Sequence, residues 1–557
     1  LIIVVFKFFY FFFFFRLKIY IIFFIFLLSF SKIFFFFSMT SIKSMLLTIV
    51  FMTFISSSFA QGFSTLQIDS IVEVAMDSNQ HAGIAIAVVK DGEVIHSKGY
   101  GISSMITGDK VDNHTRFSIA SNSKAFTSAS LALLVDEGYI NWDDKVVEHI
   151  PEFKMYNSYV TAEFTIIDLL THRSGLDLGA GDLMWVPDGN SFSIDDIITS
   201  FQYQTPVSDF RTKYDYDNLL YIVAGEIVVR KTGMLWSEFV EERIMSPLGM
   251  NESAGTISRL VDVNNIAKPH SLVDGEFMQI DEFDATVAAS AAGIYASVYD
   301  LSKWMIMQLD NGALNDSVPL ISKKNHGEMW KPYTNRGFNI IGNTPYNTHF
   351  YSYGLGWGIK DIAGYITVSH TGGMPGMLSQ TILIPELKMG VVVLTNADPG
   401  GYSFMSIPNI IVDSYIGIDS VDWIGRMTER IKSREQNGDS VVASVWEIVN
   451  KAQLNNLDYD NYVGSYSDDW FGEMVIWEKD KELWIKSIKS PKLEGRMLYY
   501  QANTFAVKWN YRDMNCDVFA SFNLSKDGKA ISFTMEGISP NIDFSFDFQH
   551  LYMVRNK

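Results

Sequence analysis

The sequence predicts an α+β protein that is followed by a small all-β part. Strand-like runs lie near both ends of residues 66–425, and helical patterns fill the stretch between them. We therefore expect one antiparallel sheet that is flanked by helices, together with a helical region. A polar helical linker over 426–457 precedes residues 458–557, where aromatic residues alternate with turn signals. Such a tail is typical of a small barrel or sandwich.

Residues 1–38 form a segment of unusual composition at the start of the 557-residue chain. They contain 16 of the 41 phenylalanines, four basic residues and no acidic residue, and the first residue is Leu1. We interpret this segment as an upstream stretch that does not belong to the native protein. A membrane leader is the alternative, because an apolar run of at least ~18 residues can span a bilayer.

A secretory signal peptide is predicted for residues 39–60. It has a basic start at Lys43, an apolar run over 45–55 and small residues at its end, which is the order that a signal peptidase recognises. We therefore expect a periplasmic or secreted protein. Anchoring in the membrane through residues 1–38 is the alternative.

The remainder of the chain is acidic. Residues 1–60 hold five of the 44 basic residues and none of the 63 acidic ones, so residues 61–557 carry a net charge of −24. This sign disfavours nucleic acid as a partner. Cys516 is the single cysteine and cannot form an internal disulfide, so a large core must supply the stability.

The elements of the first part follow in order from the hydrophobic pattern. Residues 82–102 are typical of a β-hairpin with its turn at 90–93. Residues 125–135 are apolar on most sides, which predicts a buried helix that ends at Gly138. Further helices are predicted at 165–171, 219–231, 236–244 and 297–309, and strands at 365–370, 378–384 and 390–394.

A serine and a lysine stand one helical turn apart at the start of the buried helix. In Ser121-Asn122-Ser123-Lys124 the i, i+3 spacing puts the side chains of Ser121 and Lys124 on one face. A serine hydroxyl needs a base to act as a nucleophile, and burial favours the neutral form of a lysine that could serve as one. A surface lysine after a helix-capping serine is the structural alternative, since this spacing alone is common.

Two further motifs follow in chain order. The first, Tyr216-Asp217-Asn218, lies 95 residues after the serine, and the second directly follows a predicted strand and reads His370-Thr371-Gly372-Gly373. Short motifs of this kind recur elsewhere in the chain, but the ordered set of three is hard to obtain by accident. The sequence contains no nucleotide-binding loop and no zinc-binding His-Glu-x-x-His motif, so we expect neither a cofactor nor a metal.

With these motifs the sequence resembles the class C β-lactamase, D-aminopeptidase and esterase family of Ser-x-x-Lys serine hydrolases. The resemblance covers roughly residues 66–420 and implies the β-lactamase/transpeptidase-like fold. Flanking stretches share it, namely 116–120, 169–176, 247–250, 292–295 and 354–357.

The resemblance implies a role for each residue of the motifs. Ser121 would be the acylated nucleophile and Lys124 its partner in proton transfer, while Tyr216 would act as a second proton shuttle. Asn218 would orient the substrate or the lysine. Whether Lys124 or Tyr216 is the base stays open, because a coupled pair titrates as a unit.

The third motif is implied to bind the substrate. His370 and Gly372 would line the site, and the backbone N–H groups of Ser121 and Gly373 would form an oxyanion hole. Histidine stands where the β-lactamases of the family carry a lysine, and it is mostly neutral at pH 7, so penicillin hydrolysis is not expected to be the main activity. The His-x-Gly form is similar to that of D-aminopeptidases.

Other residues near the motifs are considered for structural roles. Asp217 would raise the pKa values of its neighbours if it pointed inward, whereas the alternative is that it points to solvent. His172 and Arg173 are expected to act in packing. The tail, through the pattern at 462–466 and Gly472, resembles the lipocalin-like C-terminal domain of some peptidases of the group.

The sequence thus favours an exported serine hydrolase that forms an acyl-enzyme with a small amide or ester. A peptide with a D-residue or a peptidoglycan fragment is the expected substrate. A carboxylesterase or weak β-lactamase of the same fold is one alternative, and a slowly acylated penicillin-binding sensor is the other. The expected partners are the small substrate and, in a homo-oligomer, further copies of the chain.

Overall fold

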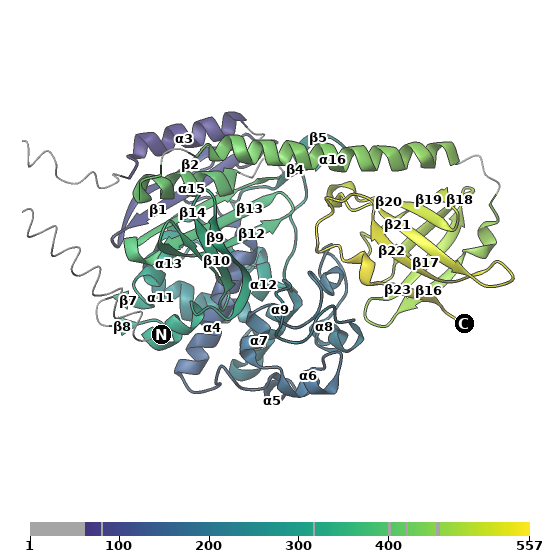
Figure 1. Ribbon diagram of the computed structural model, residues 1–557, viewed down its shortest axis with the longest axis horizontal. Coiled ribbons are helices and arrows are strands. Elements are labelled where there is room, and N and C mark those ends of the chain that lie inside the picture. The colour runs from purple at the N-terminus through teal and green to yellow at the C-terminus, as the bar shows by residue number, and fades with distance from the viewer. Residues whose placement is uncertain (1–61, 79–81, 316–317, 399–402, 419–420, 453–456) are drawn as a thin grey trace, which may run out of the picture. The chain divides into compact units, whose positions relative to one another are not determined.

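The computed structural model describes residues 62–78, 82–315, 318–398, 403–418, 421–452 and 457–557 (Figure 1). The chain divides into two compact units, of which Gly62–Lys557 is the second. All described residues belong to this second unit. The predicted leader over 1–38 and the predicted signal peptide over 39–60 lie outside the described residues.

An eight-stranded antiparallel sheet organises the first part of the unit. The N-terminal hairpin pairs directly with a C-terminal strand, for example at Ala87 and Val392, so the expected sheet of N- and C-terminal strands is confirmed. In spatial order the strands are β2 (Glu93–Gly101), β1 (Gly83–Lys90), β14 (Met389–Thr395), β13 (Met377–Ile384), β12 (Tyr365–Met374), β11 (Gly358–Ile362), β10 (Thr348–Tyr353) and β9 (Thr334–Asn343).

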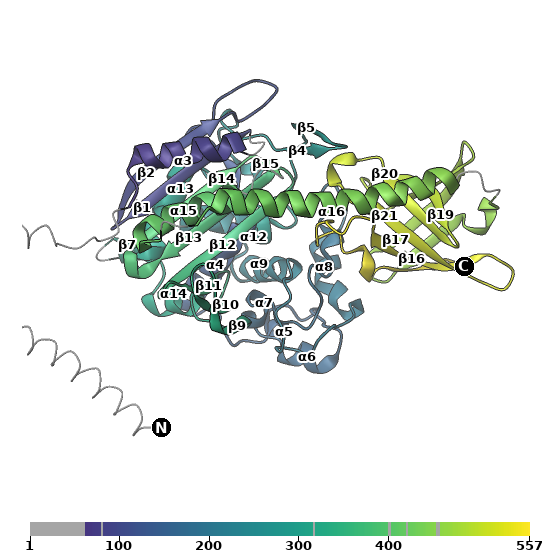
Figure 2. The same ribbon diagram turned by 45° about the horizontal axis from the view of Figure 1, so that its top comes forward.

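The two faces of this sheet are both covered. Along β1, Ala85 and Ala87 pack into the core that contains the helical region. The alternate residues Ile84 and Ile86 pack into a second core. This second core includes α3 (Thr65–Ser78) and α15 (Ser403–Ile416), which lie together over the strands in Figure 2. Because both faces are buried, β1 carries no polar side chain from Gly83 to Val89 and does not alternate.

The helical region lies between the two groups of strands in the chain, as predicted. Its central helix is α4 (Ser123–Asp136), which is buried along most of its length. The stretch predicted as one helix over 236–244 is instead α10 followed by a π-helical turn at Glu241–Met245. The other helices are α5 (Val146–His149), α6 (Ser158–Glu163), α7 (Ile166–Leu170), α8 (Ile194–Ser200), α9 (Leu219–Thr232), α10 (Trp236–Val240), α11 (Ser246–Leu248), α12 (Ala289–Ala292), α13 (Val298–Leu309) and α14 (Lys323–Met329).

Short strand pairs connect these elements. Three small sheets are formed by β15 (Ala397–Asp398), β4 (His270–Val273) and β5 (Glu276–Gln279), by β3 (Phe117–Ser118) and β6 (Tyr295–Ala296), and by β7 (Ala313–Asn315) and β8 (Val318–Pro319). The pair of β3 and β6 holds the chain immediately before Ser121.

A long helix leads from the sheet to a closed barrel. The helix α16 (Trp423–Ala452) packs at its start against the second core of the sheet and near its end, through Val445 and Val449, against the barrel. The predicted all-β tail is therefore an eight-stranded closed barrel. Its strands are β16 (Gly464–Asp468), β17 (Gly472–Lys479), β18 (Glu482–Ser487), β19 (Glu494–Gln501), β20 (Thr504–Trp509), β21 (Val518–Leu524), β22 (Ala530–Gly537) and β23 (Tyr552–Arg555).

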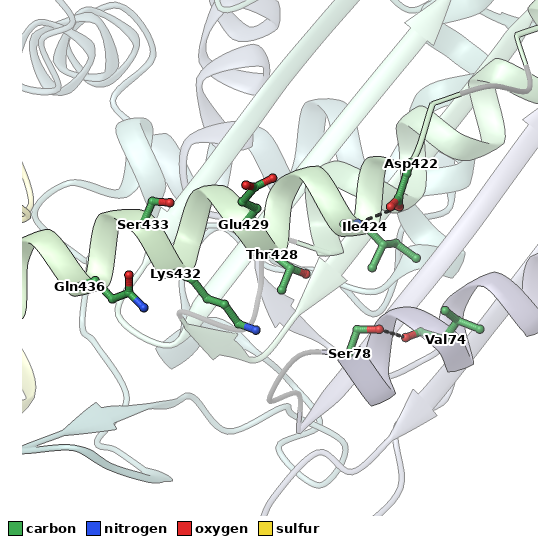
Figure 3. Close-up of a pocket in the computed structure, with 10 residues that line it drawn as sticks. Val74, Ser78, Asp422, Ile424, Thr428, Glu429, Lys432, Ser433 and Gln436 are labelled. Carbon is green, nitrogen blue, oxygen red and sulfur yellow. Dashed lines mark hydrogen bonds between the residues drawn. The ribbon is translucent and has the colours of Figure 1, made fainter.

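A surface groove lies between α3 and the first turns of α16 (Figure 3). Two hydrogen bonds at this groove each lie within one segment: Ser78 Oγ donates to the carbonyl of Val74 at 2.7 Å, and Gly425 N donates to Asp422 at 2.8 Å. Because α3 covers the face of the sheet opposite to α4, this groove is separate from the motif residues. None of the described helices combines the length and the apolar character that crossing a membrane requires.

Candidate active site

A tight turn presents Ser121 at the start of α4. Ser121 lies in the 3₁₀ turn Ala120–Asn122, and Ala120 has a φ of +46°, a conformation that residues with a side chain seldom adopt. Ser379 of β13 fixes this turn, because its hydroxyl donates to the Ile119 carbonyl at 2.7 Å and accepts from the Asn122 amide at 2.8 Å. The turn is thus held against the sheet by hydrogen bonds on both sides of the serine.

Gly372 allows β12 to approach the same turn. A Cβ atom at Gly372 would lie 2.3 Å from the Ile119 carbonyl oxygen and 2.5 Å from Ser379 Oγ. A side chain at this position would therefore push the strand away from the serine turn. At Gly373 the nearest atom to such a Cβ is a methyl carbon of Leu378 at 3.4 Å, which is ordinary contact.

Lys124 is fully buried beside the serine. Its Nζ atom lies 3.0 Å from Ser121 Oγ, 2.7 Å from Asn218 Oδ1 and 3.1 Å from the carbonyl oxygen of Ala291. Burial lowers the pKa of Lys124 to about 7, although the charges of Asp182 and Asp217 oppose this shift. The surface-lysine alternative is therefore wrong for this pair.

The three contacts determine where a neutral lysine would direct its lone pair. Asn218 Oδ1 and the Ala291 carbonyl can only accept hydrogen bonds, so they occupy the two N–H groups of a neutral amine. The third direction points to Ser121 Oγ, whose hydroxyl can donate. The site can therefore move the serine proton onto Lys124.

Tyr216 lies next to both Lys124 and Ser121. Lys124 Nζ is 4.8 Å from the centre of the Tyr216 ring. Burial raises the pKa of Tyr216 well above its ordinary value, and the neighbouring Ser121 hydroxyl opposes this shift. Among the described residues, the phenol oxygen has no hydrogen-bond partner of good geometry. A protonated Tyr216 thus has its O–H available beside Ser121.

Asn218 stands at the N-terminal end of α9 and is held by a carboxylate. Its side-chain Nδ2 donates to Asp182 Oδ2 at 2.7 Å, and the other oxygen of Asp182 accepts from the Trp185 ring at 2.9 Å. Burial raises the pKa of Asp182 well above its usual range, and its hydrogen bond from Trp185 opposes this shift. The hydrogen bond that Asn218 donates to Asp182 orients the Asn218 amide so that its oxygen faces Lys124.

Asp217 points into the protein, so the solvent-facing alternative for this residue is wrong. The side chain is fully buried, and the backbone N–H of Leu220 donates to Oδ1 at 3.3 Å. Burial raises the pKa of Asp217 to about 7, against the effect of hydrogen bonds from the start of α9. The carboxylate is near enough to raise the pKa of Lys124.

His370 is held as a neutral imidazole. Its Nδ1 is 2.6 Å from the carbonyl oxygen of Thr371, which can only accept, so Nδ1 carries the proton and Nε2 accepts from the Tyr353 hydroxyl at 2.8 Å. Burial lowers the pKa of His370 to about 3, and the charge of Lys124 adds to this. The ring centre of His370 is 6.2 Å from that of Tyr216.

His172 and Arg173 have the packing environment that the sequence suggested. The His172 ring is buried, and its centre lies 4.2 Å from that of the Tyr216 ring. Its Nδ1 accepts from the backbone N–H of Asp217 at 3.1 Å. Arg173 instead donates to the buried carboxylate of Asp168 at 2.8 Å. His172 therefore packs against the Tyr216 ring, and Arg173 stabilises the segment that carries His172.

The structure adds residues that no motif indicated. Asp182 and Tyr353 hold Asn218 and His370, and Phe544 of the C-terminal part packs edge-on against Tyr216 with ring centres 6.0 Å apart. Arg336 lies over the Tyr214 ring at 4.4 Å and contributes to the low pKa of His370. Asp182 begins a 3₁₀ turn and Phe544 lies between β22 and β23, while Tyr353 and Arg336 lie on β10 and β9.

One group of side chains has the composition of a metal site. Ligand atoms of Asp144, Glu148 and His149 lie within 4.8 Å of one another. His149 Nε2 is 3.2 Å from Asp144, which also accepts from the Asn141 backbone at 2.8 Å. The hydrogen bonds of Asp144 to His149 and Asn141 account for the position of these side chains without an ion. The expectation that the protein uses no metal stays a prediction.

Comparison with known proteins identifies the first part of the chain. A sequence profile of the beta-lactamase family matches residues 68–410. The chain belongs to the beta-lactamase family. Membership, together with this fold, indicates a serine hydrolase. A second profile, of a domain of unknown function, matches residues 450–555, so the lipocalin-like resemblance of the barrel stays a prediction.

Two relatives illustrate the range of this family. The chain is 27% identical over 374 residues to the unguisins hydrolase ungD of Aspergillus violaceofuscus, covering 63% of this chain and 65% of the relative. It is 25% identical over 339 residues to protein flp of Staphylococcus aureus, covering 60% and 63%. The alignments thus span less than two thirds of either relative.

Solved structures share the fold. The octameric penicillin-binding protein homologue from Pyrococcus abyssi aligns with a TM-score of 0.57 at 20% identity, covering 89% of this chain and 100% of its own. The D-amino acid amidase from Ochrobactrum anthropi aligns with a TM-score of 0.51 at 21% identity, covering 63% and 98%. The predicted β-lactamase/transpeptidase-like fold is confirmed.

Proposed function

We propose that this serine hydrolase cleaves small amides or esters through an acyl-enzyme on Ser121, with Lys124 as the base. The observation that carries the proposal is the 3.0 Å contact between Lys124 Nζ and Ser121 Oγ at a buried position where two acceptors occupy the other donors of the lysine. A pKa of about 7 leaves a large fraction of Lys124 neutral near neutral pH.

In the acylation step the Ser121 proton moves to Lys124 as Oγ forms a bond to the substrate carbonyl carbon. The negative charge that develops on the carbonyl oxygen would be stabilised by the backbone N–H groups of Ser121 and Gly373. The C–N or C–O bond to the leaving group then breaks. Tyr216, whose raised pKa keeps it protonated, would donate to the leaving group, and the lysine proton would restore it.

Deacylation uses the same groups in reverse. Water gives a proton to Lys124 as the water oxygen attacks the acyl carbon. The bond between this carbon and Ser121 Oγ then breaks, and Oγ takes the proton back from Lys124. Asn218 keeps Lys124 in place through both steps. The presence of both Lys124 and Tyr216 favours an enzyme that turns over, because a slowly acylated sensor would not need Tyr216 for deacylation.

We propose a D-residue peptide or peptidoglycan fragment as the substrate. The neutral His370 offers no permanent cation to a penicillin carboxylate, which favours a peptidase over a β-lactamase. The fold neighbour described as a D-amino acid amidase complexed with D-phenylalanine supports the same class. A carboxylesterase is the second candidate, because the same serine nucleophile could form an acyl-enzyme with an ester.

A panel of chromogenic substrates tests this assignment. D-alanine p-nitroanilide should be hydrolysed faster than its L-isomer, p-nitrophenyl butyrate measures esterase activity, and nitrocefin measures β-lactamase activity. Equal rates on both anilides with a dominant butyrate activity would favour the carboxylesterase. One burst of product per protein without steady turnover would favour the sensor.

We also propose that the protein is exported and can assemble with further copies of itself. The signal-like pattern over 39–60 supports export, and an N-terminus near Gln61 in protein recovered outside the cytoplasm would test it. The octameric fold neighbour supports assembly. Light scattering of the purified protein at several concentrations would test that part.

A further inference from the structure

A loop of the C-terminal part reaches the site through one buried carboxylate. Asp547, which lies between β22 and β23, is fully buried. Its Oδ2 accepts from the backbone N–H of Gly181 at 2.7 Å, and its Oδ1 accepts from that of Leu183 at 3.0 Å. Both oxygens of Asp547 are thus bonded to the residues on either side of Asp182.

Asp182 is connected to Lys124 through the side chain of Asn218. Its carboxylate accepts from Asn218 Nδ2 at 2.7 Å, and Asn218 Oδ1 accepts from Lys124 Nζ at 2.7 Å. The Asn218 amide has one donor end and one acceptor end at these two contacts, so the position of Asp182 decides which end faces Lys124. A displaced Asp182 would release the lysine from its place beside Ser121.

Neighbouring contacts hold the loop in this position. His550 bonds to Asp547 at 3.0 Å and to Asp177 at 3.1 Å, which joins the loop to the segment before Gly181. The carbonyl oxygen of Phe544 would lie 2.6 Å from a Cβ atom at Gly179. The backbone of the loop therefore lies directly against the segment that carries Asp182.

We propose that Asp547 is a positioning residue for the active site, acting through Asp182 and Asn218 on Lys124. The proposal rests on the proposed function, in which Lys124 is the base. It adds that the C-terminal part helps to hold this lysine in place. It predicts that the hydrolase domain depends on the barrel for catalytic geometry and not only for stability.

Asp547→Asn in the full chain tests the proposal. The new NH₂ group would face a backbone N–H in place of one acceptor oxygen, so the segment around Asp182 would have to move. We expect the rate at which a fluorophosphonate labels Ser121 to fall on the order of 10²-fold, as expected for small misplacements of reacting groups, with kcat falling more than KM rises. Asp543→Asn is the matched control, because Asn keeps the oxygen that accepts from the Ser545 backbone at 2.9 Å.

A double-mutant cycle separates positioning from general destabilisation. Asp182→Asn should reduce labelling by a similar factor, and the double variant should be no slower than the slower single variant, because both act on one path. Asp547→Glu, which keeps the charge but lengthens the side chain, is measured in parallel, and circular dichroism selects the folded variants. A wild-type labelling rate in a folded Asp547 variant, or fully additive losses in the cycle, would overturn the proposal. If the wild-type protein itself is not labelled at Ser121, the proposed function fails instead.

Discussion

Lys124 Nζ and Asn218 Oδ1 are 2.7 Å apart in a fully buried site, although 94 residues separate them in the chain. The amide oxygen accepts from the lysine, and the amide nitrogen is bonded to Asp182. This arrangement holds the lysine toward Ser121 without an ion pair at the lysine itself. A base is thereby positioned while its pKa stays low.

The pH dependence of acylation should report Lys124. Its pKa is lowered to about 7 mainly by burial, and the neutral form is the base, so the rate of fluorophosphonate labelling should rise with pH to a plateau with a midpoint near 7. Asp217→Asn removes a negative charge that raises this pKa, so the midpoint should move to lower pH. A midpoint near the ordinary lysine pKa, or an upward shift in the variant, would contradict the assignment.

Tyr216→Phe should slow turnover more than it changes substrate binding. The substitution keeps the ring that packs on His172 at 4.2 Å but removes the proton donor, so kcat should fall by about 10²–10⁴-fold, the usual contribution of general acid–base catalysis. Steady-state kinetics with an anilide and with an activated ester measure this. The loss should be smaller for the ester, whose leaving group needs no proton; equal losses would argue against the donor role.

Arg336 should contribute to the binding of substrates that carry a carboxylate. It is an exposed cation that lies over the Tyr214 ring, and its charge acts on His370. Arg336→Ala should raise KM about tenfold for a peptide with a free carboxylate. The matching peptide amide serves as the control substrate, and an equal rise in KM for both would show that charge recognition is not involved.

Gly372→Ala should destabilise the contact between β12 and the serine turn. The added methyl group would lie 2.3 Å from the Ile119 carbonyl, so the strand must shift, and overpacking of this kind costs about 1–3 kcal/mol. Chemical denaturation measures the free energy of unfolding. Gly373→Ala is the control, because its methyl group would meet only Leu378 at 3.4 Å, and a loss as large as at Gly372 would contradict the steric account.

The sequence predicted the elements that have strong local signals. The hairpin at 82–102 and the buried helix after Ser121 follow from hydrophobic period and turn residues, and their positions agree with β1, β2 and α4. The strands β9 to β11 were not predicted, because they lie toward the edge of the sheet. Residues such as Phe338 and Ile340 on β9 are exposed, which removes the alternation that a half-buried strand would show.

The residues that surround the motifs could not be predicted for a different reason. Asp182 begins a short 3₁₀ turn and Asp547 lies between β22 and β23, and the hydrogen bond from Gly181 to Asp547 joins residues 366 positions apart. Their role depends on burial, which only the folded chain creates. The inward direction of Asp217 was likewise undetermined, since both orientations fit the same motif.

Intact-protein mass spectrometry of the wild-type protein and of Ser121→Ala tests the central claim most directly. After incubation with a fluorophosphonate, the wild-type protein should gain the mass of one adduct, and peptide mapping should place it on Ser121. Ser121→Ala should gain none while remaining folded and should not hydrolyse the chromogenic substrates. An adduct on another residue, or unchanged turnover by Ser121→Ala, would contradict the account.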